Sequence, residues 1–128
     1  MKPGDTFIIP QPGTSLDSHL WVVISDPAQD AKAILIVNFT TLRGDSETAC
    51  VLALGEHPFV KHETCVNYRG AKVVSDADIS ALMKSGHLRP HAVVSDAILK
   101  RMRDGAANSS RMSLEHAEIL SSQGLIDC

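Results

Sequence analysis

Histidine and lysine are concentrated in one short stretch of the chain, His57-Pro58-Phe59-Val60-Lys61-His62. Histidine can give or take a proton near neutral pH, and the Lys61 ammonium can stabilise developing negative charge. A third histidine, His19, precedes the apolar run LWVVI elsewhere in the chain. These residue types suit general acid–base chemistry on an anionic substrate. The alternative is that they are solvated loop and strand-end residues, as most surface histidines are.

Hydroxyl groups end the longest β-branched run of the chain. Thr40 and Thr41 close the segment ILIVNFTT and can donate hydrogen bonds to phosphate oxygens, although threonine is also a common strand residue. Further along, Tyr68 and Arg69 can stack on a base and pair with a phosphate. In the alternative interpretation, Tyr68 packs in the core and Arg69 is solvated.

The elements that must position these side chains begin with residues 33–41, which predict a strand buried on both faces, because the run is apolar and too short for a helix. Turn signals such as PGD, QPGTS and DP separate it from neighbouring strands, and residues 55–64 predict a loop or short helical turn. Arg69-Gly70 predicts a bend or bulge. The other expected strands are 6–9, 19–25, 48–54 and 65–74. Short strands at this spacing predict a small antiparallel β-barrel.

The hydrophobic period changes after residue 74, where three helices are expected. Ser75, Ser95 and Ser113 are suitable N-caps, and the helices are predicted to end at Gly86, Gly105 and Gly124. The fold class is therefore α+β, in a single domain of residues 1–128. Within it, residues 1–74 form the barrel part, and residues 75–128 form a helical part packed on it.

Composition sets limits on the function. The 128 residues carry a formal net charge of −3, so polyanion binding would need a local patch such as Lys61, Arg69 and Lys72. No apolar run is long enough to span a bilayer and the N-terminus lacks signal-peptide features, so we expect a cytoplasmic protein without membrane contact. Three irregularly spaced cysteines argue against a disulfide framework and suit a reducing compartment.

Three motifs in chain order carry a family resemblance. They are PGDTFI at residues 3–8, HLWVVIS at 19–25 and ILIVNFTT at 34–41. Over residues 1 to about 80, the chain resembles the PemK/MazF-like toxin endoribonucleases, whose fold is a small SH3-like barrel with appended helices. Gly-Asp pairs and apolar strands ending in serine are common, so the specificity of the match comes from their order in one short chain.

The resemblance implies RNA cleavage without a metal or other cofactor, through attack of the 2′-hydroxyl. It assigns the phosphate-binding threonine to Thr40, with Thr41 beside it, and it aligns His19 with the catalytic arginine of the family. Leu20 stands where the family has proline. The resemblance also implies an RNA substrate, a homodimer and an antitoxin protein as partner.

Combined with the residue types, this resemblance gives a predicted site. The proposed catalytic residues are His19, Thr40, His57 and His62, in which one histidine acts as base and another as acid. The proposed substrate-binding residues are Thr41, Lys61, Tyr68 and Arg69.

Two other interpretations use the same residues. In the first, His57, His62 and Cys65 bind zinc, with His19 or Cys50 as fourth ligand, although no paired ligand spacing supports a metal site. In the second, the chain is a non-catalytic SH3-like barrel that binds a protein or nucleic-acid partner, which the replacement of the family arginine favours.

Overall fold

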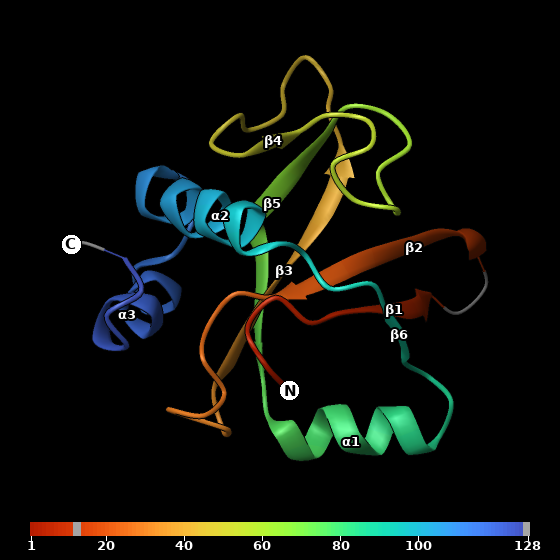
Figure 1. Cartoon of the computed structure of the whole chain (residues 1–128), viewed down its shortest axis with the longest axis vertical. Helices are drawn as coiled ribbons and strands as arrows, with labels where there is room; N and C mark the ends of the chain where they lie inside the picture. Colours follow the sequence, from red (N-terminus) through yellow and green to blue (C-terminus); the bar gives the residue numbers. More distant parts are fainter. Residues whose placement is uncertain (12–13, 127–128) are drawn as a thin grey trace.

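The chain alternates short strands with three helices around one antiparallel sheet. The computed structural model describes residues 1–11 and 14–126, and gives only the backbone for residues 10, 11 and 14–18. Figure 1 shows α2 and α3 together on one side of the sheet and α1 apart from them. The elements are β1 (Thr6–Gln11), β2 (Thr14–Val23), β3 (Ile34–Thr41), β4 (Val51–Leu52), β5 (Thr64–Val74), α1 (Asp76–Lys84), β6 (Arg89–His91), α2 (Asp96–Asn108) and α3 (Leu114–Ser122).

The fold class is α+β, as predicted. The six strands form one sheet in the order β4-β5-β3-β2-β1-β6, and every pairing is antiparallel. A closed barrel is not confirmed, because β4 and β6 are sheet edges and no ladder joins them within the described residues. The expected strand 48–54 is reduced to Val51 and Leu52, which pair with Cys65 and Thr64. A two-residue edge strand has too few backbone N–H and C=O groups to pair with a further strand.

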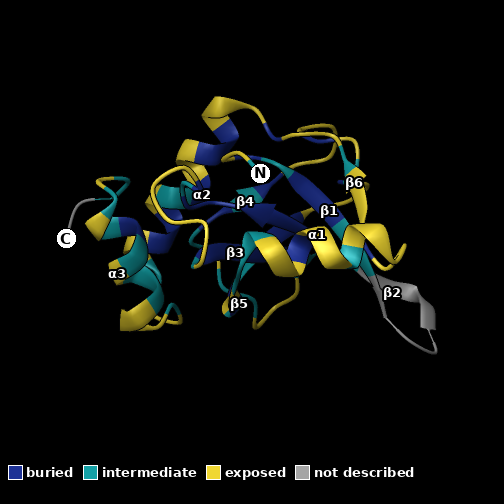
Figure 2. Ribbon diagram, turned by 90° about the horizontal axis from the view of Figure 1, so that it is seen from below, coloured by how far each residue is buried: buried dark blue, intermediate teal, exposed yellow. Residues whose placement is uncertain are grey.

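Strand β3 lies inside the sheet between β5 and β2, and its residues from Ile34 to Phe39 are buried, which confirms the prediction for this run. Successive side chains of a strand point to opposite faces. Leu35, Val37 and Phe39 accordingly join the main core. Ile34 and Ile36 join a second core on the other face. Figure 2 shows β1 and β3 as mostly buried, whereas the helices and loops carry many exposed residues.

Each core includes helix residues. Met102 of α2 and Leu120 of α3 lie in the main core, both with no exposed area. Ile79 of α1 lies in the second core with Trp21 of β2. The two faces of the sheet are therefore covered by different helices, which explains why β3 needs apolar residues at successive positions.

The expected bend around Gly70 is present in β5. The register of β3 against β5 shifts between Ile36, which pairs with Lys72, and Asn38, which pairs with Asn67. The backbone N–H of Gly70 donates to Oδ1 of Asn67 at 3.2 Å. A Cβ atom at Gly70 would collide with the Asn67 amide, so the close turn favours glycine.

The helix starts were predicted correctly. Ser75, Ser95 and Ser113 are the N-caps of α1, α2 and α3, and each side chain accepts a hydrogen bond from the backbone N–H three residues later. Gly86 and Gly124 follow the ends of α1 and α3 with positive φ, as expected for helix-terminating glycines.

Gly105 was wrongly predicted as a helix end. Helix α2 continues through it to Asn108, and Gly105 is buried. A Cβ atom there would collide with the Tyr68 hydroxyl and lie 3.0 Å from the Ala49 carbonyl oxygen. The residue is glycine because α2 packs closely on β5, and this contact cannot be read from local sequence.

Two other features of the sheet differ from expectation. Strand β2 begins at Thr14, within the segment expected as a loop, of which residues 12 and 13 lie outside the described part. Strand β6 was not predicted, because three residues that include Pro90 give almost no strand signal. Among the described helices, none is long and apolar enough to cross a membrane.

Candidate functional site

Two of the predicted histidines contact the last three residues of β3, Phe39-Thr40-Thr41. Nδ1 of His19 lies 3.2 Å from the carbonyl oxygen of Phe39. Nε2 of His62 lies 3.0 Å from the hydroxyl oxygen of Thr41. Residues distant in the chain thus meet at the point where β3 leaves the core.

The Phe39 carbonyl determines which nitrogen of His19 carries the proton. A carbonyl oxygen can only accept, so Nδ1 must donate, and the neutral ring then has a free lone pair on Nε2. Among the described residues, nothing hydrogen-bonds to Nε2. His19 is only partly buried, so this lone pair can reach a substrate. An oriented imidazole with a free nitrogen is what a general base requires.

His19 reaches β3 through its side chain, because the backbone pairing of β2 with β3 ends at Trp21 and Asn38. Its ring bonds to the carbonyl oxygen of Phe39, the residue before Thr40. On the other side of β3, Thr40 pairs with Cys65 of β5. Paired residues of antiparallel strands point to the same face. Thr40 and Cys65 therefore point to the same face of the sheet, next to the Phe39 carbonyl that holds His19.

Asn38 adds a polar group two residues before Thr40 on β3. Its side chain is 5% exposed, and its Oδ1 has no hydrogen-bond partner within the described residues. A buried acceptor left without a partner costs roughly 1–3 kcal/mol. Asn38 pairs with Asn67 on β5, so two amide side chains adjoin Thr40 on the same sheet face. Such unsatisfied groups are more frequent at functional sites than in ordinary cores.

Thr40 also lines a pocket of about 150 Å³ at the end of β3. Arg111, from the connection between α2 and α3, reaches this pocket, and its Nη2 donates to the carbonyl oxygen of Asp45 at 3.0 Å. Sequence reasoning missed Arg111 because no motif or spacing links it to β3. The lining residues are Thr40, Asp45, Ser46, Glu47, Cys65, Val66, Asn67 and Arg111.

His57 lies near the end of β3 but on the core side. It is 3% exposed, and its ring packs edge-on against Phe39 at a centroid distance of 6.3 Å. Nε2 donates to the carbonyl oxygen of Ala92 at 2.7 Å, and Nδ1 accepts from the N–H of Phe59 at 3.1 Å. Both nitrogens are occupied, so His57 offers neither to a substrate. It connects the loop after β4 to the segment after β6.

Acidification is expected to destabilise the protein through His57. Burial is the main cause that lowers the pKa of His57 below its usual value of 6.5. The unfolded chain then binds the proton more readily, so stability falls as pH drops below that value. Urea unfolding at pH about 7.5 and about 5.5 measures the effect. The stability of His57→Gln should depend less on pH than that of the wild type, and equal dependence would contradict this role.

Tyr68 is part of the main core and cannot stack on a base. It is 1% exposed, and its hydroxyl donates to the carbonyl oxygen of Met102 at 2.6 Å. Burial also raises its pKa, so the hydroxyl stays protonated. Arg69 and Lys61 are exposed and remain accessible to a polyanion. For Tyr68, the interpretation in which the side chain packs in the core therefore holds.

The residues considered for zinc do not come together. In residues 1–11 and 14–126, no group of three or more His, Cys, Asp or Glu side chains could hold a metal ion. Cys50 and Cys65 are buried free cysteines, and burial raises the pKa of the Cys50 thiol. The expected ligands His57 and His62 differ in environment, since His57 is buried and His62 is exposed.

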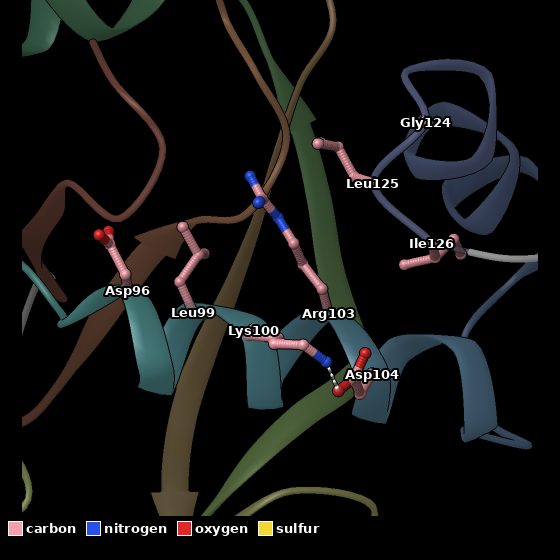
Figure 3. A pocket seen from close by; sticks show the side chains of 8 residues that line it. All are labelled: Asp96, Leu99, Lys100, Arg103, Asp104, Gly124, Leu125 and Ile126. Carbon is pink, nitrogen blue, oxygen red and sulfur yellow. Dashed lines mark hydrogen bonds and ion pairs between the residues drawn. The ribbon is translucent and has the colours of Figure 1, made fainter.

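A second pocket, of about 360 Å³, lies between α2 and the segment after α3 (Figure 3). Arg103 extends across it, and its Nε donates to the carbonyl oxygen of Ile24 at 2.8 Å. Lys100 and Asp104 form an ion pair at its rim. None of the predicted site residues lines this pocket, so it is separate from the end of β3.

Comparison with models of protein families, with curated proteins and with solved structures found no match for this chain.

Proposed function

We propose that the chain is a toxin-like endoribonuclease that cleaves RNA without a metal ion. The observation that carries this proposal is the orientation of His19, whose Nδ1 is held by the Phe39 carbonyl while Nε2 has no hydrogen-bond partner in the described part of the chain. The motif resemblance suggests the substrate class, and the contacts of His19 with Phe39 and of His62 with Thr41 support a base and an acid at the end of β3.

The reaction is an in-line transfer within the RNA. Nε2 of His19 takes the proton of a 2′-hydroxyl, whose oxygen forms a bond to the adjacent phosphorus. The bond from phosphorus to the 5′-oxygen breaks, and protonated His62 gives its proton to that leaving oxygen. Thr40 and Thr41 donate hydrogen bonds to the phosphate oxygens as their charge increases. The products are a 2′,3′-cyclic phosphate and a 5′-hydroxyl.

Exposed cations near the site extend the contact with RNA. Lys61 precedes His62, and Arg69 lies at the bend of β5. Nζ of Lys72 lies 5.3 Å from the ring centroid of Trp21, which follows His19 by two residues on β2. These side chains compensate locally for the net negative charge of the chain.

The same proposal includes an SH3-like barrel and two kinds of protein partner. We infer that the sheet corresponds to an SH3-like barrel, because the side chain of His57 bridges the loop after one edge strand and the segment after the other. The resemblance further suggests a cytoplasmic homodimer that is neutralised by an antitoxin.

A second function is a barrel that binds RNA or a protein without cleaving. The observation that favours it is His19 itself, which stands where the related toxins have arginine, followed by Leu20 in place of proline. This alternative predicts binding of RNA without product formation.

Cleavage of a long mixed-sequence RNA in the presence of EDTA is expected. The purified protein should cut at defined sites and leave 2′,3′-cyclic phosphate ends, which can be identified by end-specific ligation. The same preparation carrying His19→Ala controls for contaminating nucleases. Intact RNA that is nevertheless bound would favour the binding module. Cleavage only after addition of Zn²⁺ would contradict the metal-independent mechanism.

A further inference from the structure

The connection between α2 and α3 brings a guanidinium group to the end of β3. Arg111 lines the same pocket as Thr40 and Asn67, on the β5 side of Thr40, whereas His19 lies on the β2 side. We propose that Arg111, Thr40 and Asn67 form a phosphate subsite for an RNA strand. This inference rests on the proposed function, and it assigns a binding role to the helical part of the chain.

Arg111 is positioned for an anion. Its Nη2 donates to the Asp45 carbonyl oxygen, and the other guanidinium N–H groups have no acceptor in the described part of the chain. No carboxylate in that part lies within 4 Å of the guanidinium as an ion-pair partner. Arginine can give two parallel hydrogen bonds to a phosphate.

The backbone around Arg111 is anchored, which keeps the side chain at the pocket. Its N–H donates to Oγ of Ser109 at 3.0 Å, and that hydroxyl donates to the carboxylate of Glu47 at 2.7 and 2.8 Å. Met112, the next residue, packs against the main core. Glu47 thus positions the segment that presents Arg111.

The pocket suits a small anion. Its volume of about 150 Å³ is below the roughly 300 Å³ of pockets for drug-sized ligands. The Thr40 hydroxyl and the Asn67 amide supply neutral hydrogen-bonding groups. Thr40 is shared with the proposed cleavage site, so the subsite would hold a phosphate of the same strand.

Two carboxylates line the pocket and oppose an anion. The carboxylate of Glu47 accepts the hydrogen bond of the Ser109 hydroxyl, whereas the side chain of Asp45 is exposed and only its backbone carbonyl holds Arg111. Removing the charge of Asp45 leaves that carbonyl intact. The subsite therefore predicts opposite effects for two substitutions, weaker RNA binding for Arg111→Gln and tighter binding for Asp45→Asn.

The test measures binding of a single-stranded 2′-O-methyl oligonucleotide, which lacks the attacking hydroxyl and cannot be cleaved. Fluorescence anisotropy over a range of salt gives both affinity and salt slope. Arg111→Gln should weaken binding roughly tenfold at low salt and reduce the slope of log K against log salt by about 0.7. Arg89→Gln is the matched control, an exposed arginine on β6 that should leave both values unchanged.

Arg111→Lys provides a second variant that keeps the charge. It should retain the salt slope and lose affinity, because lysine cannot bind a phosphate with two parallel hydrogen bonds. Wild-type affinity and slope in Arg111→Gln would overturn the subsite, and RNA cleavage by the wild type would then leave the proposed function standing. A wild type that binds but does not cleave would remove the proposed reaction, whereas loss of binding in Arg111→Gln would still support the subsite. A wild type that does not bind would overturn both.

Discussion

His19→Ala is expected to abolish RNA cleavage and leave the protein folded. The substitution removes an imidazole nitrogen that is held in place by the Phe39 carbonyl contact and left open to substrate, and a positioned general base contributes about 10²- to 10⁴-fold to the rate. The fold should persist, because the described hydrogen bond of His19 is a single contact to the Phe39 carbonyl, worth about 1 kcal/mol. Initial rates on a defined RNA measure the loss, and circular dichroism checks the fold.

Three variants separate proton transfer from position. His19→Gln retains an amide that can donate to the Phe39 carbonyl but cannot take a proton, so it should be as inactive as His19→Ala. His62→Ala removes the proposed acid and should also lose cleavage while remaining folded. His87→Ala is the control, because His87 is exposed and bonds to Ser85 at the end of α1. Near-normal cleavage by both His19 variants would rule out His19 as the base.

Features that depend on local sequence were predicted well. The buried strand β3 follows from an apolar β-branched run, and the starts of the three helices follow from Ser75, Ser95 and Ser113. In each case a few adjacent residues determine the structure. A closed barrel depends instead on how far the edge strands extend, which adjacent residues do not determine. In the segment expected as the fourth strand, only Val51 and Leu52 pair.

The candidate site was predictable to the extent that it lies on strands. The order of motifs assigned His19 and Thr40, and the ring of His19 bonds to the carbonyl oxygen of Phe39, the residue before Thr40. The environments of His57 and Arg111 could not be predicted from the sequence. Hydrogen bonds with Ala92 and Phe59 occupy both nitrogens of His57, and the turn after α2 directs Arg111 to the pocket at the end of β3. Both outcomes depend on how distant segments pack.

Gly105→Ala is expected to destabilise the protein, although the same change in an exposed helix would stabilise it by about 1 kcal/mol. The new Cβ would collide with the Tyr68 hydroxyl, which cannot move away without losing its hydrogen bond to Met102. It would also press on the Ala49 carbonyl and on Cys50. Overpacking of this kind costs about 2 kcal/mol, measurable as a lower midpoint in urea unfolding.

A double-mutant cycle identifies the contact responsible. Tyr68→Phe alone loses the hydrogen bond to Met102, but in its background Gly105→Ala no longer meets a hydroxyl, so its cost should fall by about 1 kcal/mol. Gly44→Ala is the control, because a Cβ there meets nothing within 4 Å and should change stability by less than about 0.5 kcal/mol. If Gly105→Ala were as stable as the wild type, α2 would not pack on β5 as closely as described. Additive effects of Gly105→Ala and Tyr68→Phe would instead assign the cost to Ala49 and Cys50.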